Sequence, residues 1–332
     1  MSPLHICISE NRTTDEVGAK LLILSLTEHE PDAVLHVFAD GLSERFKLWL
    51  RAFPNVVRER AAIDPGLTWN VKARLLAELL DDGLGAVVWI DSDVIVTAPI
   101  SGHFDGSAGD SLVVAEEFFT YRNRGVAART RGWGLPVGRD LPFTPNSAVL
   151  RVTDRHRALL SAWQRLLDRP DYKALQAGPW SDRPFFMMGD QDALSAILGS
   201  ADFADLPVRP LRRGRDIAQC FRADGYSPTE RLANLRRMPS FVHAQGEKPW
   251  RAAGGGTIYQ RVSPYWYAAR SYAGRLDPHE RRWLTERPAA AKILHALAFG
   301  HPSLAGLLPA ARGVAAKRLS AAVRQVKTRA SR

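Results

Sequence analysis

The chain has 332 residues, 45% of them hydrophobic and 24% charged, which is an ordinary balance for a globular protein with a sizeable core. Its two cysteines, Cys7 and Cys220, are too few for a disulfide framework, so we expect a reducing, cytoplasmic compartment. The start of the chain lacks the basic leader of a secretory signal. No stretch approaches the roughly 18–20 apolar residues that span a bilayer.

The formal net charge of +10 is concentrated at the end of the chain. Residues 287–332 hold nine Lys and Arg and no Asp or Glu, so the remainder carries a formal +1. An enzyme that works on nucleic acid more often carries a basic stripe across its working face. We therefore expect no nucleic-acid partner.

Apolar runs alternate with helical periodicity over the first 115 residues. In chain order the pattern predicts strands at 4–8, 34–38, 55–57 and 86–90, and helices at 15–29 and from about 69 to 80. The run at 86–90 is wholly apolar, as suits a central strand covered on both faces. This alternation predicts a Rossmann-like α/β half.

The second part of the chain is less regular. Residues 116–145 are rich in Arg, Gly and aromatics without clean periodicity, which predicts a long functional loop. Further on, the pattern predicts strands at 148–152 and 241–242 and helices at 155–168 and 190–198, with an irregular Pro-rich stretch at 169–186. We expect one domain, 1–275, made of two halves, 1–115 and 116–275. A basic helical tail, 276–332, follows it.

Two carboxylates stand at the end of the apolar strand 86–90. Asp91 and Asp93 are two positions apart, so an extended backbone places them on the same side, at the end of a strand where α/β sheets bind ligands. Two like charges in close proximity are costly unless a cation neutralises them. The pattern favours a metal site; a pair of solvated turn aspartates is the alternative.

A remote histidine supports the metal site. His243 ends the predicted short strand that begins at Phe241, and it offers a third ligand. A lone histidine is more often structural, but Gly246 lets the backbone approach a phosphate closely and Lys248 can neutralise one. These neighbours favour the ligand interpretation.

Four motifs follow one another along the chain: Asp91-Ser92-Asp93, Pro145-Asn146-Ser147-Ala148-Val149-Leu150, Gly189-Asp190-Gln191-Asp192 and His243 through Lys248-Pro249-Trp250. With these motifs in this order, the chain resembles the retaining glycosyltransferases of family 8, which include glycogenin and bacterial lipopolysaccharide galactosyl- and glucosyltransferases. It differs from the family pattern in having Ala148 for a glycine and one residue, Glu247, where two usually stand.

The resemblance implies a GT-A-type fold with a mixed sheet flanked by helices, a UDP-sugar donor and Mn²⁺, with Mg²⁺ as the substitute. It makes 1–275 the catalytic domain, with 1–115 as the nucleotide-binding half and 116–275 as the acceptor half. It also implies roles for individual residues. The metal ligands would be Asp91, Asp93 and His243, and the residues at the diphosphate would be Lys72, Ser92, Gly246 and Lys248. Ser9 and Asn11 would meet the uridine, Arg74 would reach the donor sugar or its phosphates, and Asn146, Asp190 and Gln191 would surround the transferred sugar.

The predicted reaction is transfer of a hexose from a UDP-sugar to a glycan or lipid-linked glycan of the lipopolysaccharide or capsule type. Retention of anomeric configuration is implied by the resemblance alone. Three alternatives remain open: an inverting GT-A enzyme, a nucleotidyltransferase that makes nucleotide sugars, and a non-catalytic nucleotide-sugar-binding protein. The stretch after the first strand lacks the Gly-rich, basic signature of the second alternative.

Two further segments, 118–133 and the basic tail, have a predicted function. Aromatic and arginine side chains between 118 and 133 predict an acceptor-binding lid, with simple closure over the core as the alternative, and Trp180, Phe185 and Phe186 are expected to line the same cleft. In the tail, apolar residues at helical spacing over 314–326 predict a basic amphipathic helix on the anionic surface of a bacterial inner membrane. A solvated terminus is the alternative. The residues of the predicted lid are Phe118, Phe119, Tyr121, Arg122, Arg124, Arg129, Arg131 and Trp133.

Overall fold

The computed structural model describes residues 3–59, 69–105, 111–117, 125–220, 225–246, 248–251, 263–285, 307–308, 310–316 and 318–319. The chain divides into two compact units. The larger unit comprises Met1–Glu16, Leu26–Ser92 and Pro99–Leu211, and the smaller unit comprises Val17–Ser25, Asp93–Ala98 and Arg212–Arg332.

The larger unit is built on a seven-stranded mixed sheet with the order β3-β2-β1-β4-β7-β6-β8. Strands β1 to β4 run parallel, β7 is antiparallel to both β4 and β6, and β6 is parallel to β8. The strands are β1 (His5–Ser9), β2 (Val34–Phe38), β3 (Val56–Glu59), β4 (Ala86–Ile90), β6 (Leu112–Glu116), β7 (Pro145–Thr153) and β8 (Val208–Leu211). The predicted mixed α/β architecture is confirmed.

Strand β4 occupies the middle of this sheet, as its sequence predicts. Its residues are mostly β-branched or aromatic and are buried from Val87 onward. It pairs with β1 through Ile6 opposite Val88 and with β7 through Ile90 opposite Val149. The chain leaves β4 at its carboxyl end and enters the acidic turn directly.

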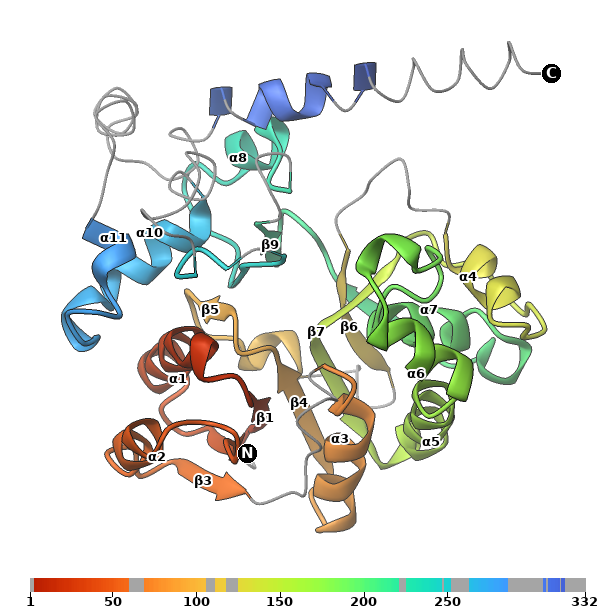
Figure 1. Ribbon diagram of the computed structural model, residues 1–332, viewed down its shortest axis with the longest axis horizontal. Helices are drawn as coiled ribbons and strands as arrows, with labels where there is room; N and C mark the ends of the chain where they lie inside the picture. The colour runs from red at the N-terminus through yellow and green to blue at the C-terminus, as the bar shows by residue number, and fades with distance from the viewer. Residues whose placement is uncertain are drawn as a thin grey trace. The chain divides into compact units, whose positions relative to one another are not determined.

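Helices cover one face of the sheet. Val87 and Trp89 point to the same face of β4 and belong to a buried cluster with residues of α3 (Lys72–Asp81), α5 (Arg157–Leu167) and α7 (Asp190–Leu198). Helix α3 packs on α5, α5 on α7 and α7 on β7 (Figure 1). This layer holds the first residues of α3 and α7 close to the end of β4.

Helix α7 begins at the predicted residue for a local reason. The backbone N–H of Gly189 donates to the Asp192 carboxylate at 3.2 Å, so an acidic side chain satisfies a donor at the start of the helix. Both Asp190 and Asp192 lie in the first turn, where the helix dipole favours negative charge.

Two segments that the sequence predicted to be irregular contain a helix. Helix α4 (Val126–Gly132) lies in the predicted loop 116–145; it is short, and its buried residues include Arg129 and Thr130 beside Val126 and Ala127, so no apolar periodicity marks it. Helix α6 (Pro170–Ala177) lies in the predicted irregular stretch 169–186; its proline occupies the first turn, where the missing N–H costs nothing. Strand β7 also begins at Pro145, three residues before the prediction.

Other boundaries agree with the sequence within a few residues. Helix α1 (Glu16–His29) matches its prediction closely, and α3 begins three residues later than predicted. Short elements without a strong period were missed, among them α2 (Glu44–Leu50), which Ser43 caps by accepting the Phe46 N–H.

The smaller unit is built on a three-stranded sheet with the order β5-β10-β9. Strand β10 runs antiparallel to β5 and parallel to β9. The elements are β5 (Val94–Val96), β9 (Ile217–Gln219), α8 (Pro228–Ala233), β10 (Phe241–His243), α10 (Pro264–Ser271) and α11 (Arg282–Thr285). Lys20 of the middle of α1 pairs with Glu280 at 2.5 Å and ties α1 into this unit.

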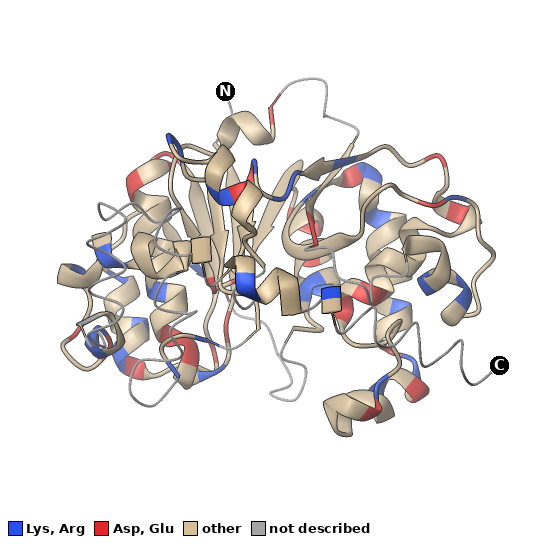
Figure 2. Cartoon of the chain, turned by 90° about the horizontal axis from the view of Figure 1, so that it is seen from above, with Lys and Arg blue, Asp and Glu red and all other residues tan. Residues whose placement is uncertain are grey.

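Acidic and basic residues are interspersed over the described chain (Figure 2). In the tail, residues 307–308, 310–316 and 318–319 are helical, whereas 287–306 and the predicted amphipathic stretch beyond 319 lie outside the described residues. Within the described chain, no helix combines the length and apolar character needed to cross a membrane.

Candidate metal centre

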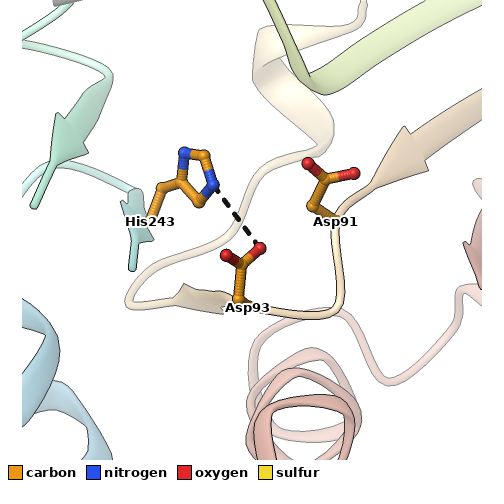
Figure 3. A group of neighbouring side chains, drawn as sticks. All are labelled: Asp91, Asp93 and His243. Atoms are coloured by element: carbon orange, nitrogen blue, oxygen red, sulfur yellow. Dashed lines mark ion pairs between the residues drawn. The ribbon is translucent and has the colours of Figure 1, made fainter. Parts of the chain in front are cut away.

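The acidic turn joins the ends of two strands. Asp91 directly follows β4, and its N–H donates to the Ala148 carbonyl of β7 at 2.8 Å. Asp93 directly precedes β5. One carboxylate oxygen of Asp91, one of Asp93 and one imidazole nitrogen of His243 lie within 4.8 Å of one another (Figure 3). The structure thus brings together the three side chains that the sequence nominates as metal ligands.

Asp93 is buried between two basic groups. His243 Nε2 lies 3.4 Å from its Oδ1, and the Lys248 ammonium contacts its Oδ2 and donates to the Ala244 carbonyl at 3.0 Å. Burial opposes ionisation, but Lys248 and His243 outweigh it and hold the pKa of Asp93 far below its usual range. Asp93 is therefore ionised and ready to bind a cation.

The ring of His243 is oriented by Gln219 at the end of β9. Its Nδ1 lies 2.7 Å from the Gln219 side-chain oxygen, which can only accept, so Nδ1 carries the proton. With Nδ1 directed to Gln219, the ring can offer Nε2 to a cation at the acidic turn. Sequence reasoning missed Gln219.

Asp91 is held by Lys72 at the start of α3. The buried Lys72 ammonium lies 2.9 Å from Asp91 and 3.2 Å from Asp190, and it donates to the Ser147 hydroxyl at 2.8 Å. Burial lowers the pKa of Lys72, but Asp190 and Asp91 outweigh it and raise the pKa above its usual value. The Trp89 indole also donates to Asp91 at 2.6 Å.

The same lysine connects the metal ligand to Asp190 at the start of α7. Ser147 donates to Asp190 at 2.8 Å. Burial raises the pKa of Asp190 above its usual value, and Lys72 only partly offsets this effect. Lys72, expected at the donor diphosphate, is here an internal counter-ion for two carboxylates.

Asn146 and Gln191, both predicted at the transferred sugar, lie side by side. The Asn146 amide donates to Gln191 at 3.0 Å and to Glu117 at 2.8 Å, and the Gln191 amide donates to Glu117 at 2.9 Å. The pairing of β6 with β7 shifts register after Val114, and such irregularities commonly re-aim side chains beside active sites. Sequence reasoning missed Glu117.

The loop after β1 is tied to the acidic turn. The Ser92 hydroxyl donates to the buried Glu10 carboxylate at 2.6 Å, and Glu10 also accepts the backbone N–H of Asn11 at 3.1 Å. Ser92 therefore fixes the turn to the loop that carries Ser9 and Asn11, the residues expected at the nucleoside. Glu10 is a further residue that the sequence analysis passed over.

Gly246 and Arg74, which the resemblance assigns to the donor, are also described by the structure. Gly246 has a positive φ of 85°, a conformation that favours glycine at this turn. Arg74 lies on α3, half-exposed, with its Nε 3.6 Å from the carboxylate of Glu78 on the same helix.

Two residues of the predicted lid, Arg129 and Trp133, are buried. Arg129 is buried in α4 and donates to Asp192 at 2.7 Å, and Trp133 is buried with its indole donating to the Phe186 carbonyl at 2.5 Å. The lid interpretation is wrong for these two residues, because an internal carboxylate and the hydrophobic core take up their side chains. Residues 118–124 lie outside the described chain.

Comparison by sequence finds neither a family model nor a curated protein that matches. Comparison of structures finds the galactosyltransferase LgtC in complex with donor and acceptor sugar analogs, at 18% identity, covering 82% of this chain and 100% of that chain, with a TM-score of 0.51. An active-site mutant of LgtC matches at 17% identity, 85% and 100% coverage, and a TM-score of 0.54. The bifunctional glycosyltransferase WbbM matches at 14% identity with a TM-score of 0.53, covering 86% of this chain and 52% of its own. The predicted GT-A fold is confirmed.

Proposed function

We propose that this protein is a metal-dependent glycosyltransferase that takes a hexose from a UDP-sugar and passes it to a glycan or lipid-linked glycan acceptor. The observation that carries the proposal is the convergence of Asp91, Asp93 and His243 at the end of β4 on a GT-A fold. The glycosyltransferase matches support the reaction class.

The three side chains fit a divalent cation. They supply two hard oxygen ligands and one imidazole nitrogen, a set that suits Mn²⁺ somewhat better than Mg²⁺. The hydrogen bond from His243 to Gln219 prepares the nitrogen in its ligand form. When bound, the cation would neutralise charge on the diphosphate leaving group.

Two basic residues have complementary roles. Lys248 reaches Asp93 from a flexible side chain and can also carry positive charge to a diphosphate oxygen, where charge develops as the sugar departs. Lys72 is buried and keeps the carboxylates of Asp91 and Asp190 close together without unbalanced repulsion. We assign Lys248 to the donor and Lys72 to the framework of the site.

Asn146, Asp190 and Gln191 are assigned to the transferred sugar. Asp190 is tied to Asp91 through Lys72, and the amides of Asn146 and Gln191 are held by Glu117. Arg74, Ser9, Asn11 and Gly246 keep their expected roles at the donor. Retention of configuration belongs to the proposal, and an inverting enzyme is distinguished by analysing the anomer of the product.

The proposal is tested by screening UDP-glucose, UDP-galactose and UDP-N-acetyl sugars for Mn²⁺-dependent hydrolysis. We expect at least one donor to be hydrolysed, and Asp93→Asn and His243→Ala to reduce the rate by roughly a hundred-fold or more while the protein remains folded. Leu48→Ala, at an exposed position of α2, is the matched control and should have no effect. Equal hydrolysis with Mn²⁺ and with a chelator would refute the metal-dependent assignment.

A further inference from the structure

The segment between α6 and α7 carries an unusually exposed tryptophan. Trp180 begins a short 3-10 turn, and its side chain is 56% exposed. Among the exposed large hydrophobic side chains of the described chain, it is the only aromatic one. Because tryptophan is usually well buried, this exposure calls for an explanation beyond packing.

The side chain of Arg183 packs against the Trp180 indole. The guanidinium of Arg183 lies 4.9 Å from the centre of the indole ring, as in a cation–π contact. Arg183 donates to the Gln176 side chain at 2.7 Å and to its carbonyl at 2.7 Å, which fixes the guanidinium on the end of α6. Pro179 and Pro184 restrict the backbone on both sides. The indole is therefore exposed yet rigid.

Arg183 also contacts the backbone just before the residues of the proposed sugar site. It also donates to the Met188 carbonyl at 3.1 Å, one residue before the Gly189-Asp190 start of α7. Gln176 donates to the neighbouring Met187 carbonyl at 2.9 Å. The cation–π contact and these hydrogen bonds of Arg183 thus join the exposed indole to the segment that positions Asp190 and Gln191.

A rigid exposed indole next to this segment suits a sugar ring. The C–H face of a pyranose is apolar and slightly positive, and it stacks on the electron-rich face of an aromatic ring. Because the side chain is already immobilised, little conformational entropy is lost on binding. Asp190 is 6% exposed, whereas Trp180 is 56% exposed and can be reached by a glycan from solvent.

We propose that Trp180, backed by Arg183, is a stacking platform for a pyranose ring of the acceptor glycan. This inference rests on the proposed function, because only a glycosyltransferase needs an acceptor sugar beside Asp190. It assigns acceptor selection to the segment between α6 and α7.

The test uses the full chain labelled with 5-fluorotryptophan, with UDP and the diamagnetic Mg²⁺ present, and fluorine NMR. The Trp180 resonance is assigned from its loss in Trp180→Phe. The probes are the methyl glycosides of glucose, galactose and mannose, together with lactose. We expect at least one of them to shift this resonance, and Trp180→Ala to weaken its binding roughly five- to ten-fold. Arg183→Gln should weaken it in the same direction, and Leu48→Ala should not.

The outcomes separate the two proposals. Donor hydrolysis is measured on the wild type and on the Leu48→Ala control, which should hydrolyse the donor at the same rate. Hydrolysis by the wild type without any shift of the Trp180 resonance would overturn the platform alone. A shift without hydrolysis of any UDP-sugar would refute the proposed function and leave the sugar platform supported.

Discussion

At the scale of single residues, the proposed metal centre depends on how His243 presents its ring. Two nitrogens are available, and only the one facing Asp93 can serve the acidic turn. Gln219 settles the choice by accepting a hydrogen bond from the other nitrogen at 2.7 Å. Such partners of metal-binding histidines commonly change metal affinity by 10- to 100-fold when removed, as a rough guide.

We therefore predict that Gln219→Ala weakens Mn²⁺ binding by roughly 10- to 100-fold, measured by electron paramagnetic resonance of free Mn²⁺. Gln219→Glu keeps an acceptor oxygen at the same place and should retain tight binding. Wild-type affinity in Gln219→Ala would show that the ring needs no such partner.

Some residues of this site could be predicted from the sequence, and others could not. Asp91, Asp93 and His243 were nominated because each stands at the end of an apolar strand, a pattern that is visible locally. Gln219 and Glu117 were not, because their partners lie 24 or more residues away and only the sheet registers bring them together. Lys72 was nominated for the donor, since sequence alone does not show that α3 buries its ammonium between two carboxylates.

At the scale of elements, local signals decided what could be predicted. Strand β4 and helix α7 were predicted with their observed boundaries, because one is wholly apolar and the other has a clear N-terminal acidic signal. Helix α4 was missed because it is short and the ion-paired Arg129 takes up part of its buried face, which weakens the apolar periodicity. Where charge compensation substitutes for hydrophobicity, a sequence pattern cannot show the element.

The buried ion pair between Arg129 of α4 and Asp192 of α7 should stabilise the fold. Removing Arg129 leaves the buried Asp192 carboxylate unpaired, so Arg129→Met should lower the free energy of unfolding by about 3–5 kcal/mol. Burial raises the pKa of Asp192 to about 6, with Arg129 opposing that rise. Since this lies above the unfolded value of about 3.9, the stabilisation from protonating Asp192 is complete below about pH 4 and is lost as the pH rises through about 6.

The cost of Arg129→Met should therefore be larger at about pH 8 than at about pH 5, where the unpaired carboxylate can take up a proton. Urea unfolding of the variant and the wild type at both pH values measures this difference. Arg131→Met, on the same helix, is the control. An equal cost at the two pH values would contradict the role assigned to Asp192.

At the scale of the whole molecule, charge is unevenly distributed along the chain. The interspersed charges of the described residues contrast with residues 287–332, which carry nine basic residues and no acidic ones. We propose that this tail attaches the protein to an anionic membrane surface. Peripheral attachment would bring the enzyme to a lipid-linked acceptor on the cytoplasmic side of a bacterial inner membrane.

The tail proposal predicts vesicle binding that depends on basic charge. Each Lys or Arg near anionic headgroups contributes about 1 kcal/mol, so replacing Lys317, Arg318, Arg324 and Lys327 by Gln should largely abolish flotation with phosphatidylglycerol vesicles. Neutral phosphatidylcholine vesicles should bind neither form. Unchanged flotation of the variant with anionic vesicles would defeat the proposal.

The central claim, a cation held by Asp91, Asp93 and His243 against a donor diphosphate, is tested most directly by calorimetric titration of UDP. We predict heat of binding in the presence of Mn²⁺, its loss on chelation, and its loss in Asp93→Asn, because the acidic turn repels the diphosphate when no cation is bound. UDP binding of equal affinity with Mn²⁺ and with chelator, or in Asp93→Asn, would contradict the account.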